Sequence, residues 1–140
     1  MAFTNQVTER GPSVQSEPRP RTTIDPAAGV LVTGAAGFVG ARVVRALLDA
    51  GVARVRCLVR DPGELGSLRA AVDGRLEERC EIVRGNLLSP PDCARAVRGT
   101  QFVFHLAAGR GKSFPACFQG SVVSTRNLLD LSAVALLSHV

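Results

Sequence analysis

Hydrophobic residues after Gly29 follow the pattern of a chain in which strands and helices alternate. Val30–Val32 is a short uninterrupted apolar run, which predicts a strand covered on both faces. Residues 38–50 repeat apolar and charged positions with a helical period, and Gly51 stands where a C′ glycine would end the helix. The side chains expected to form the buried face of this helix are Val39, Val43, Ala46, Leu47 and Ala50.

The same alternation continues along the chain. Further strands are predicted at 54–59, 81–83 and 101–107, the last as a buried strand. Apolar residues recur at helical spacing over 65–76, Ser89 and Pro90 open a helix that Gly99 ends, and a last helix is predicted near 121–131. Four alternations with short connections predict an α/β fold, in which a parallel sheet carries helices on both faces.

Residues 1–28 differ in character from the rest of the chain. They are rich in Pro, Ser, Thr and Gln, and their few apolar side chains cannot offset the entropy lost on ordering. The sequence therefore predicts a disordered tail at 1–28, followed by one domain over 29–140.

Composition narrows the possible partners. No apolar run reaches the roughly 18 residues that a membrane span needs, so no membrane partner is expected. The net charge is +5, but a chain without Tyr or Trp offers little surface for stacking bases, and we do not expect nucleic acid as a partner. The four cysteines and two histidines lack the spacing of metal ligands, so no metal site is predicted. The residues before the domain lack the apolar core of a secretory signal, which favours the cytoplasm.

The segment 33–40, Thr-Gly-Ala-Ala-Gly-Phe-Val-Gly, connects a predicted strand to a predicted helix. This is the setting in which a glycine-rich turn binds phosphate. Gly34 permits the sharp reversal, Gly37 leaves room for a diphosphate, and Gly40 lets the helix approach the strand. The backbone N–H groups of Phe38 and Val39 would then face an anion at the helix N-terminus.

Three later segments extend this motif, namely Arg-Gly-Asn-Leu at 84–87, Phe-His-Leu-Ala-Ala at 104–108 and Ser-Val-Val-Ser-Thr-Arg-Asn-Leu-Leu at 121–129. With the glycine turn, they resemble the extended branch of the short-chain dehydrogenase/reductase superfamily, the NAD(P)-dependent epimerase/dehydratase group. The resemblance implies a Rossmann-like sheet of about four βα units in the order 3-2-1-4. It also implies a dinucleotide held by Gly34, Gly37, Phe38, Val39, Gly40, Asn86, Leu87, Leu106, Ala107 and Ala108. Asn86 replaces the usual Asp that accepts a hydrogen bond from adenine, so weaker adenine recognition is expected.

Arg60 bears on which cofactor is used. It ends the second predicted strand, where the adenosine ribose lies in dinucleotide-binding folds. An acid there binds the 2′-hydroxyl of NAD, whereas an Arg can hold the 2′-phosphate of NADP. Val59 takes the position where NAD-binding relatives carry Asp, and Arg60 resembles the Arg of NADP-using reductases. NADP is therefore the favoured cofactor. One alternative is NAD, with Asp61 binding the ribose, and the other is that Arg60 is simply a solvated side chain at the end of a strand.

No catalytic residue is predicted in this chain. The resembling enzymes transfer hydride with a Tyr-x-x-x-Lys pair, whereas this sequence contains no Tyr and a single Lys, Lys112, which lies upstream of the required place. His105 is expected to be structural. The chain is therefore expected to be a truncated cofactor-binding half that is inactive alone, with the outer edge of strand 101–107 open to a complementary half or a second copy. The alternative is a non-catalytic module for dinucleotide sensing or partner docking.

Overall fold

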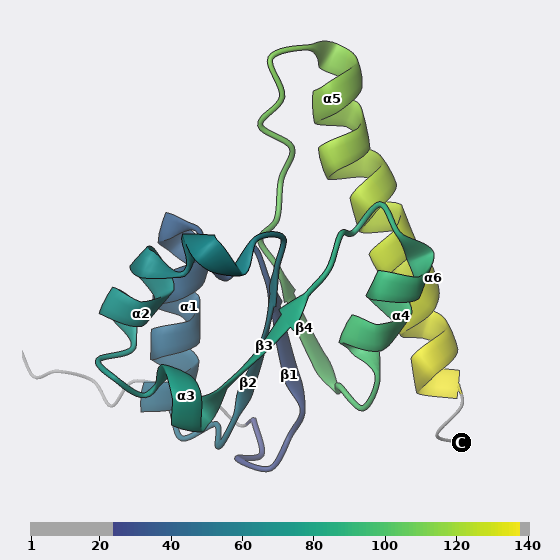
Figure 1. Cartoon of the computed structure of the whole chain (residues 1–140). Helices are drawn as coiled ribbons and strands as arrows, with labels where there is room; N and C mark the ends of the chain where they lie inside the picture. Colours follow the sequence, from purple (N-terminus) through teal and green to yellow (C-terminus); the bar gives the residue numbers. More distant parts are fainter. Residues whose placement is uncertain (1–23, 138–140) are drawn as a thin grey trace, which may run out of the picture.

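The computed structural model describes residues 24–137, so most of the predicted disordered tail lies outside the described residues. Four parallel strands form one sheet in the order β3-β2-β1-β4 (Figure 1). The strands are β1 (Val30–Thr33), β2 (Val55–Val59), β3 (Cys80–Arg84) and β4 (Phe102–His105). The predicted fold class and strand order are confirmed.

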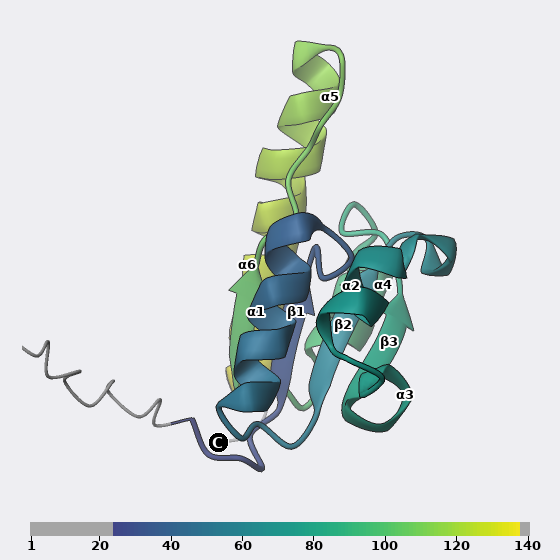
Figure 2. The same cartoon turned by 90° about the vertical axis from the view of Figure 1, so that its left-hand side faces the viewer.

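Helices cover both faces of the sheet (Figures 1 and 2). One face carries α1 (Phe38–Asp49), the short helix η1 (Pro62–Glu64), α2 (Gly66–Ala71) and α3 (Leu76–Arg79). The other face carries α4 (Pro90–Val97) and α6 (Ser124–Leu137). α6 is the last part of a long helical run that begins with α5 (Phe114–Phe118) and η2 (Gln119–Val123), and α5 extends beyond the end of the sheet (Figure 1). α4 begins as predicted, because the Ser89 side chain caps it by accepting a hydrogen bond from the backbone N–H of Asp92.

Two hydrophobic clusters hold these layers together. Val30 and Val32 of β1 pack with Val44 of α1 and Leu68 of α2 on one face. On the other face the larger members of the cluster are Leu31, Leu58, Leu87 and Leu128. All four residues of β1 are buried, as the apolar run predicts for a central strand covered on both faces.

The buried face of α1 differs from the predicted one. Its buried residues are Gly40, Ala41, Val44, Leu47 and Leu48, whereas Val39 is 59% exposed. The helix starts against the glycine turn, and a Cβ on Gly40 would overlap the carbonyl oxygen of Gly34. This close approach turns the small residues of α1 toward the sheet and leaves Val39 outside. Gly51 follows the helix with a φ of +100°, in agreement with its predicted role.

Helical boundaries differ in two further places. The spacing over 65–76 spans two short helices rather than one, because Asp73 and Gly74 between them have φ values of +50° and +78°. The last helical run begins at Phe114 instead of near Ser121, and Pro115 lies in its first turn, a position that proline favours. Five residues of this run, η2, have the wider π-helical geometry.

Strand β4 is less buried than predicted. Phe102 is 43% exposed and Val103 is 36% exposed. The cause is the position of β4 at the sheet edge, with no strand on its outer side among the described residues.

The described residues begin at Ile24, a few residues before the boundary predicted at Gly29. The backbone N–H of Ala28 donates to the carbonyl of Asp25, and Ala53 donates to the carbonyl of Pro26. Ile24 packs against the hydrophobic cluster that contains Val30 and Val44. Residues 24–28 therefore form a turn that closes the amino-terminal end of the sheet.

Candidate functional site

The glycine turn after β1 is built on close backbone contacts. Gly34 has a φ of +67°, and a Cβ there would come within 2.8 Å of the backbone nitrogen of Ala107. The backbone N–H of Gly37 donates to the carbonyl of Gly34 at 3.0 Å, which closes the turn. Only glycine fits the position of Gly34, because a side chain would be both strained and crowded.

The N-terminus of α1 is open to an anion. Gly37 is the N-cap residue and has an extended conformation, and no side chain caps the first turn. That turn also lacks an acidic residue. The positive end of the helix dipole and the free N–H groups are therefore available to a negatively charged ligand such as a diphosphate. The site fits the diphosphate that the sequence predicts here.

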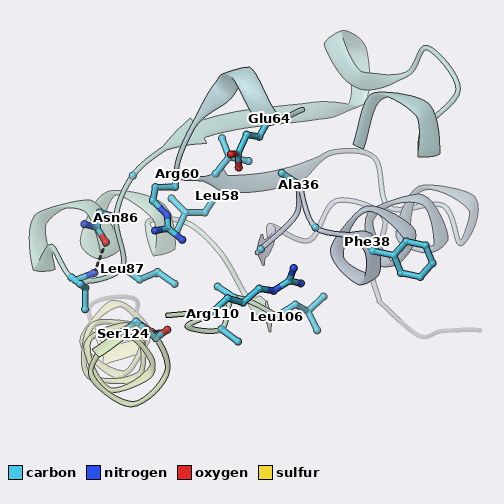
Figure 3. Close-up of a pocket in the computed structure, with 18 of the residues that line it drawn as sticks. Ala36, Phe38, Leu58, Arg60, Glu64, Asn86, Leu87, Leu106, Arg110 and Ser124 are labelled. Carbon is cyan, nitrogen blue, oxygen red and sulfur yellow. Dashed lines mark hydrogen bonds between the residues drawn. The ribbon is translucent and has the colours of Figure 1, made fainter. Parts of the chain in front are cut away.

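A cleft of about 520 Å³ lies in front of this helix end (Figure 3). The predicted residues that line it are Gly34, Gly37, Phe38, Arg60, Asn86, Leu87, Leu106, Ala107 and Ala108. Val39 and Gly40 do not line it. The Val39 side chain is exposed, and Gly40 lies beneath the turn, where its role is to allow close packing.

Ten further residues line the cleft that are not among the predicted cofactor-binding residues, although Val59, Gly85 and Ser124 lie at positions or in motifs singled out from the sequence. They are Ala36, Leu58, Val59, Glu64, Ser67, Gly85, Leu88, Arg110, Gly120 and Ser124. Arg110 brings a positive charge to the cleft. Its position in the sequence could have indicated a ligand-binding role, because it follows β4 at the carboxyl end of the sheet, where α/β folds bind ligands. In Figure 3 the Arg60 and Arg110 side chains reach into the cleft from different elements.

Asp61, the acid next to Arg60, is engaged elsewhere. Its carboxylate accepts a hydrogen bond from the backbone N–H of Gly63 at 2.8 Å and caps η1. Asp61 is not among the residues that line the cleft. Arg60, by contrast, lines the cleft and makes no hydrogen bond or ion pair with the residues from 24 to 137.

Asn86 is held in a tight turn at the end of β3. Its side-chain oxygen accepts a hydrogen bond from the backbone N–H of Leu88 at 3.0 Å. The backbone N–H of Asn86 donates to the carboxylate of Asp92 at 2.9 Å. This N–H, together with the nearby Arg95, holds the pKa of the Asp92 carboxyl below its usual value. Since the Asn86 oxygen already has one donor, an adenine amino group would have to share it.

His105 lies behind the wall of the cleft. Its Nδ1 is 2.6 Å from the hydroxyl oxygen of Thr33, and its Nε2 is 2.9 Å from that of Thr125. Burial lowers the pKa of His105 below its ordinary value of 6.5. The imidazole joins β4 to β1 and to α6 and does not line the cleft, which agrees with a structural side chain.

Two further observations concern residues 24–137. None of their helices is both long enough and apolar enough to cross a lipid bilayer. They also contain no group of three or more His, Cys, Asp or Glu side chains arranged to hold a metal ion.

The fold and the glycine turn define a dinucleotide-binding α/β protein, and comparison with known proteins specifies the class. The NAD(P)H-binding family matches residues 34–138. Dihydroflavonol 4-reductase of Zea mays is 43% identical over 79 residues, which cover 56% of this chain and 22% of that protein. Cinnamoyl-CoA reductase 1 of Oryza sativa is 33% identical over 104 residues, covering 74% of this chain and 30% of that protein.

A solved structure shares the fold as well. A short-chain dehydrogenase/reductase superfamily protein of Agrobacterium tumefaciens, determined with bound NAD, superimposes with a TM-score of 0.60 at 32% identity. The superposition covers 76% of this chain and 29% of that protein. The chain belongs to the NAD(P)H-binding family, within the extended short-chain dehydrogenase/reductase superfamily. It spans between about a fifth and a third of the length of these relatives.

Proposed function

We propose that this chain binds NADP in the cleft at the N-terminus of α1 and acts as the cofactor-binding half of a reductase or dehydrogenase. The observation that carries the proposal is the pairing of two features in one cleft. An uncapped helix N-terminus meets a cleft that Arg60 lines from the end of β2. The first feature suits the diphosphate of either cofactor, and the second suits the additional 2′-phosphate of NADP.

The order of the strands supports a direction for the bound dinucleotide. Adenosine would lie over the ends of β2 and β3, between Arg60 and Asn86, and the diphosphate over the turn after β1. The nicotinamide half would then extend toward β4, where Leu106–Ala108 line the cleft and Arg110 supplies a second positive charge.

The acidic residues near Arg60 bear on the choice between NADP and NAD. Asp61 caps η1 and is therefore a poor partner for a ribose hydroxyl. Glu64 does line the cleft and is the acid best placed to accept from the ribose of NAD. The proposal assigns the dominant role to Arg60, because a guanidinium can bind the 2′-phosphate with two hydrogen bonds.

Replacing Arg60 with glutamine tests this assignment. We expect the dissociation constant of NADP to rise roughly 30-fold and that of NAD to change less than about threefold, because only NADP has the 2′-phosphate. Isothermal titration calorimetry measures both constants. Glu64→Gln is the matched control, with NADP binding retained. Equal losses for both cofactors in Arg60→Gln would contradict the proposed role, and a selective loss of NAD in Glu64→Gln would favour NAD as the cofactor.

We do not expect this chain to catalyse hydride transfer by itself. The relatives named above are reductases, so the bound cofactor would serve hydride transfer, but the 140 residues include no Tyr to act as the acid. We propose that this chain alone does not turn over and that a complementary half or a second copy covers the open edge of β4. The exposed Phe102 and Val103 support this, together with Leu129 on α6.

Mixing the chain with NADPH and a dihydroflavonol or cinnamoyl-CoA, the compounds named for its relatives, should give binding without oxidation of the cofactor. Absorbance at the reduced nicotinamide band follows the oxidation, and calorimetry follows the binding. Steady oxidation by the purified chain would contradict the proposed division of the active site. Binding without oxidation by a stable monomer would favour the alternative of a dinucleotide-sensing module.

A further inference from the structure

A chain of hydrogen bonds connects the floor of the cleft to the helix behind it. The hydroxyl oxygen of Thr33 is 3.2 Å from the backbone nitrogen of Leu106 and 3.3 Å from that of Ala107. It is also 2.6 Å from Nδ1 of His105, whose Nε2 is 2.9 Å from the hydroxyl of Thr125. Thr33 is fully buried, and His105 is half-buried.

The donors and acceptors of this hydrogen-bond network determine which nitrogen of His105 carries the proton. The two backbone N–H groups can only donate, and both point at the lone pairs of the Thr33 hydroxyl oxygen. The N–H of Leu106 also reaches the backbone carbonyl of Thr33, at 3.3 Å. The Thr33 hydroxyl proton must then point at Nδ1 of His105, which accepts it. A neutral imidazole of this kind carries its own proton on Nε2.

The Thr125 side of the hydrogen-bond network gives the same proton assignment for His105 independently. The hydroxyl of Thr125 donates to the backbone carbonyl of Ser121, so its proton is not available to His105. Nε2 of His105 must therefore be the donor to the Thr125 oxygen. Every donor and acceptor in this hydrogen-bond network has a partner only when His105 is neutral with its proton on Nε2.

The anchored peptide also supports the phosphate-binding turn. A Cβ on Gly34 would lie 2.8 Å from the nitrogen of Ala107 and 2.8 Å from the carbonyl carbon of Leu106. Leu106 and Ala107 line the cleft themselves. A shift of this peptide would therefore move the floor of the cleft and remove the backing of the turn.

We propose that His105 is a positioning residue whose neutral form holds the floor of the cofactor cleft, and that its protonation releases this floor and weakens dinucleotide binding. The part of the inference that concerns affinity rests on the proposed function. A proton on Nδ1 would add a third donor to the Thr33 hydroxyl oxygen, which has room for two, so at least one of the contacts to Leu106 and Ala107 would be lost.

The charges around His105 leave it free to respond in this way. β1 carries no ionisable side chain. On α6, Arg126 and Asp130 form an exposed ion pair with each other at 3.6 Å. In the loop after β4, Arg110 and Lys112 are exposed. Burial is the one cause of the lowered pKa of His105, without a contribution from a charged neighbour.

The sign of the pH dependence follows from the lowered pKa. The folded state favours neutral His105, so this stabilisation is fully present above about pH 6.5 and is lost as the pH falls through the lower pKa of the folded protein. The carboxyls of Asp49, Glu77 and Asp92 also have lowered pKa values, so they stay ionised at pH 5.0.

The test uses NAD rather than NADP, because a 2′-phosphate itself titrates near pH 6. We expect the dissociation constant of NAD for the unmodified chain to rise roughly fivefold between pH 7.5 and the lower pH at which nitrogen NMR shows His105 to be protonated. In His105→Asn the side-chain oxygen can still accept from Thr33 but cannot take up a proton, so the affinity should stay constant over this range. Nitrogen NMR of the imidazole should show the proton on Nε2 at pH 7.5.

A second variant keeps His105 and removes its partner on α6. Thr125→Val should weaken NAD binding roughly threefold at pH 7.5, although Thr125 does not line the cleft. Thr100→Val is the matched control, because the Thr100 hydroxyl donates to the carbonyl of Val97 before the start of β4, at the opposite end of the strand. This variant should bind NAD like the unmodified chain.

Two results would overturn the inference: a proton on Nδ1 at pH 7.5, or an unmodified chain whose NAD affinity is as independent of pH as that of His105→Asn. Failure of the proposed function is distinguishable from both, because then neither NAD nor NADP would bind at any pH. The proton position, and the exchange rates of the Leu106 and Ala107 amides, would still decide whether the hydrogen-bond chain responds to pH.

Discussion

Replacing Gly37 with valine should abolish dinucleotide binding and leave the fold intact. Gly37 has a φ of −76° and a ψ of 166°, an extended conformation that valine adopts readily. A Cβ at this position would lie 3.2 Å from the carbonyl oxygen of Gly34, a tight contact that a shift of a few tenths of an ångström relieves, and it would meet no other atom. The two methyl groups would instead fill the space in front of the α1 N-terminus, where the diphosphate should bind. We expect a loss of affinity of at least about 100-fold by calorimetry.

A matched control separates this loss from a general effect of valine. A Cβ on Gly66, at the start of α2, would meet no atom within 4 Å, and Gly66 does not line the cleft. Gly66→Val should therefore bind the cofactor normally, and both variants should keep the circular dichroism spectrum of the unmodified chain. Normal affinity in Gly37→Val would place the diphosphate somewhere other than the glycine turn.

Replacing Gly40 with alanine should instead damage the fold itself. A Cβ there would overlap the carbonyl oxygen of Gly34 and lie 2.8 Å from its carbonyl carbon and 2.9 Å from the Cα of Ala35. All three are backbone atoms of the turn, so relief requires α1 to move away from β1. We expect a loss of roughly 3 kcal/mol in the free energy of unfolding and a fall in melting temperature of roughly 10 °C or more.

Gly66→Ala is the control for Gly40→Ala, since it adds the same methyl group in open space at a helix start. The two variants have equal composition, and only the first should lose stability and cofactor binding together. Equal melting temperatures for the pair, measured by calorimetry, would contradict the close contact between α1 and the turn.

The strands and the glycine turn are predictable because their signals are local. Val30–Val32 is apolar at every position and becomes the buried centre of the sheet. The turn can be identified from its glycines together with the strand before and the helix after. Ser89 caps α4 through its own side chain, so this boundary is also visible in the sequence.

The features that the sequence does not reveal depend on distant contacts. The apolar residues of α1 extend around much of the helix, so periodicity alone does not say that Val44 is buried and Val39 exposed. Their orientation follows from the contact between Gly40 and Gly34, which only the folded turn creates. The sequence places Arg110 after β4, at the carboxyl end of the sheet, but the approach of its side chain to the cleft depends on the path of the loop. Among the predicted residues, Arg60 lies where the sequence places it, and its selectivity stays a prediction.

The most direct test of the binding site is an amide NMR titration of the chain with NADP. The largest shifts should fall on the backbone amides of Gly37, Phe38 and Val39, with smaller ones at Leu106 and Ala107, and they should saturate together with one dissociation constant. If these amides keep their positions at millimolar NADP, the dinucleotide does not bind at the α1 N-terminus and the account is wrong.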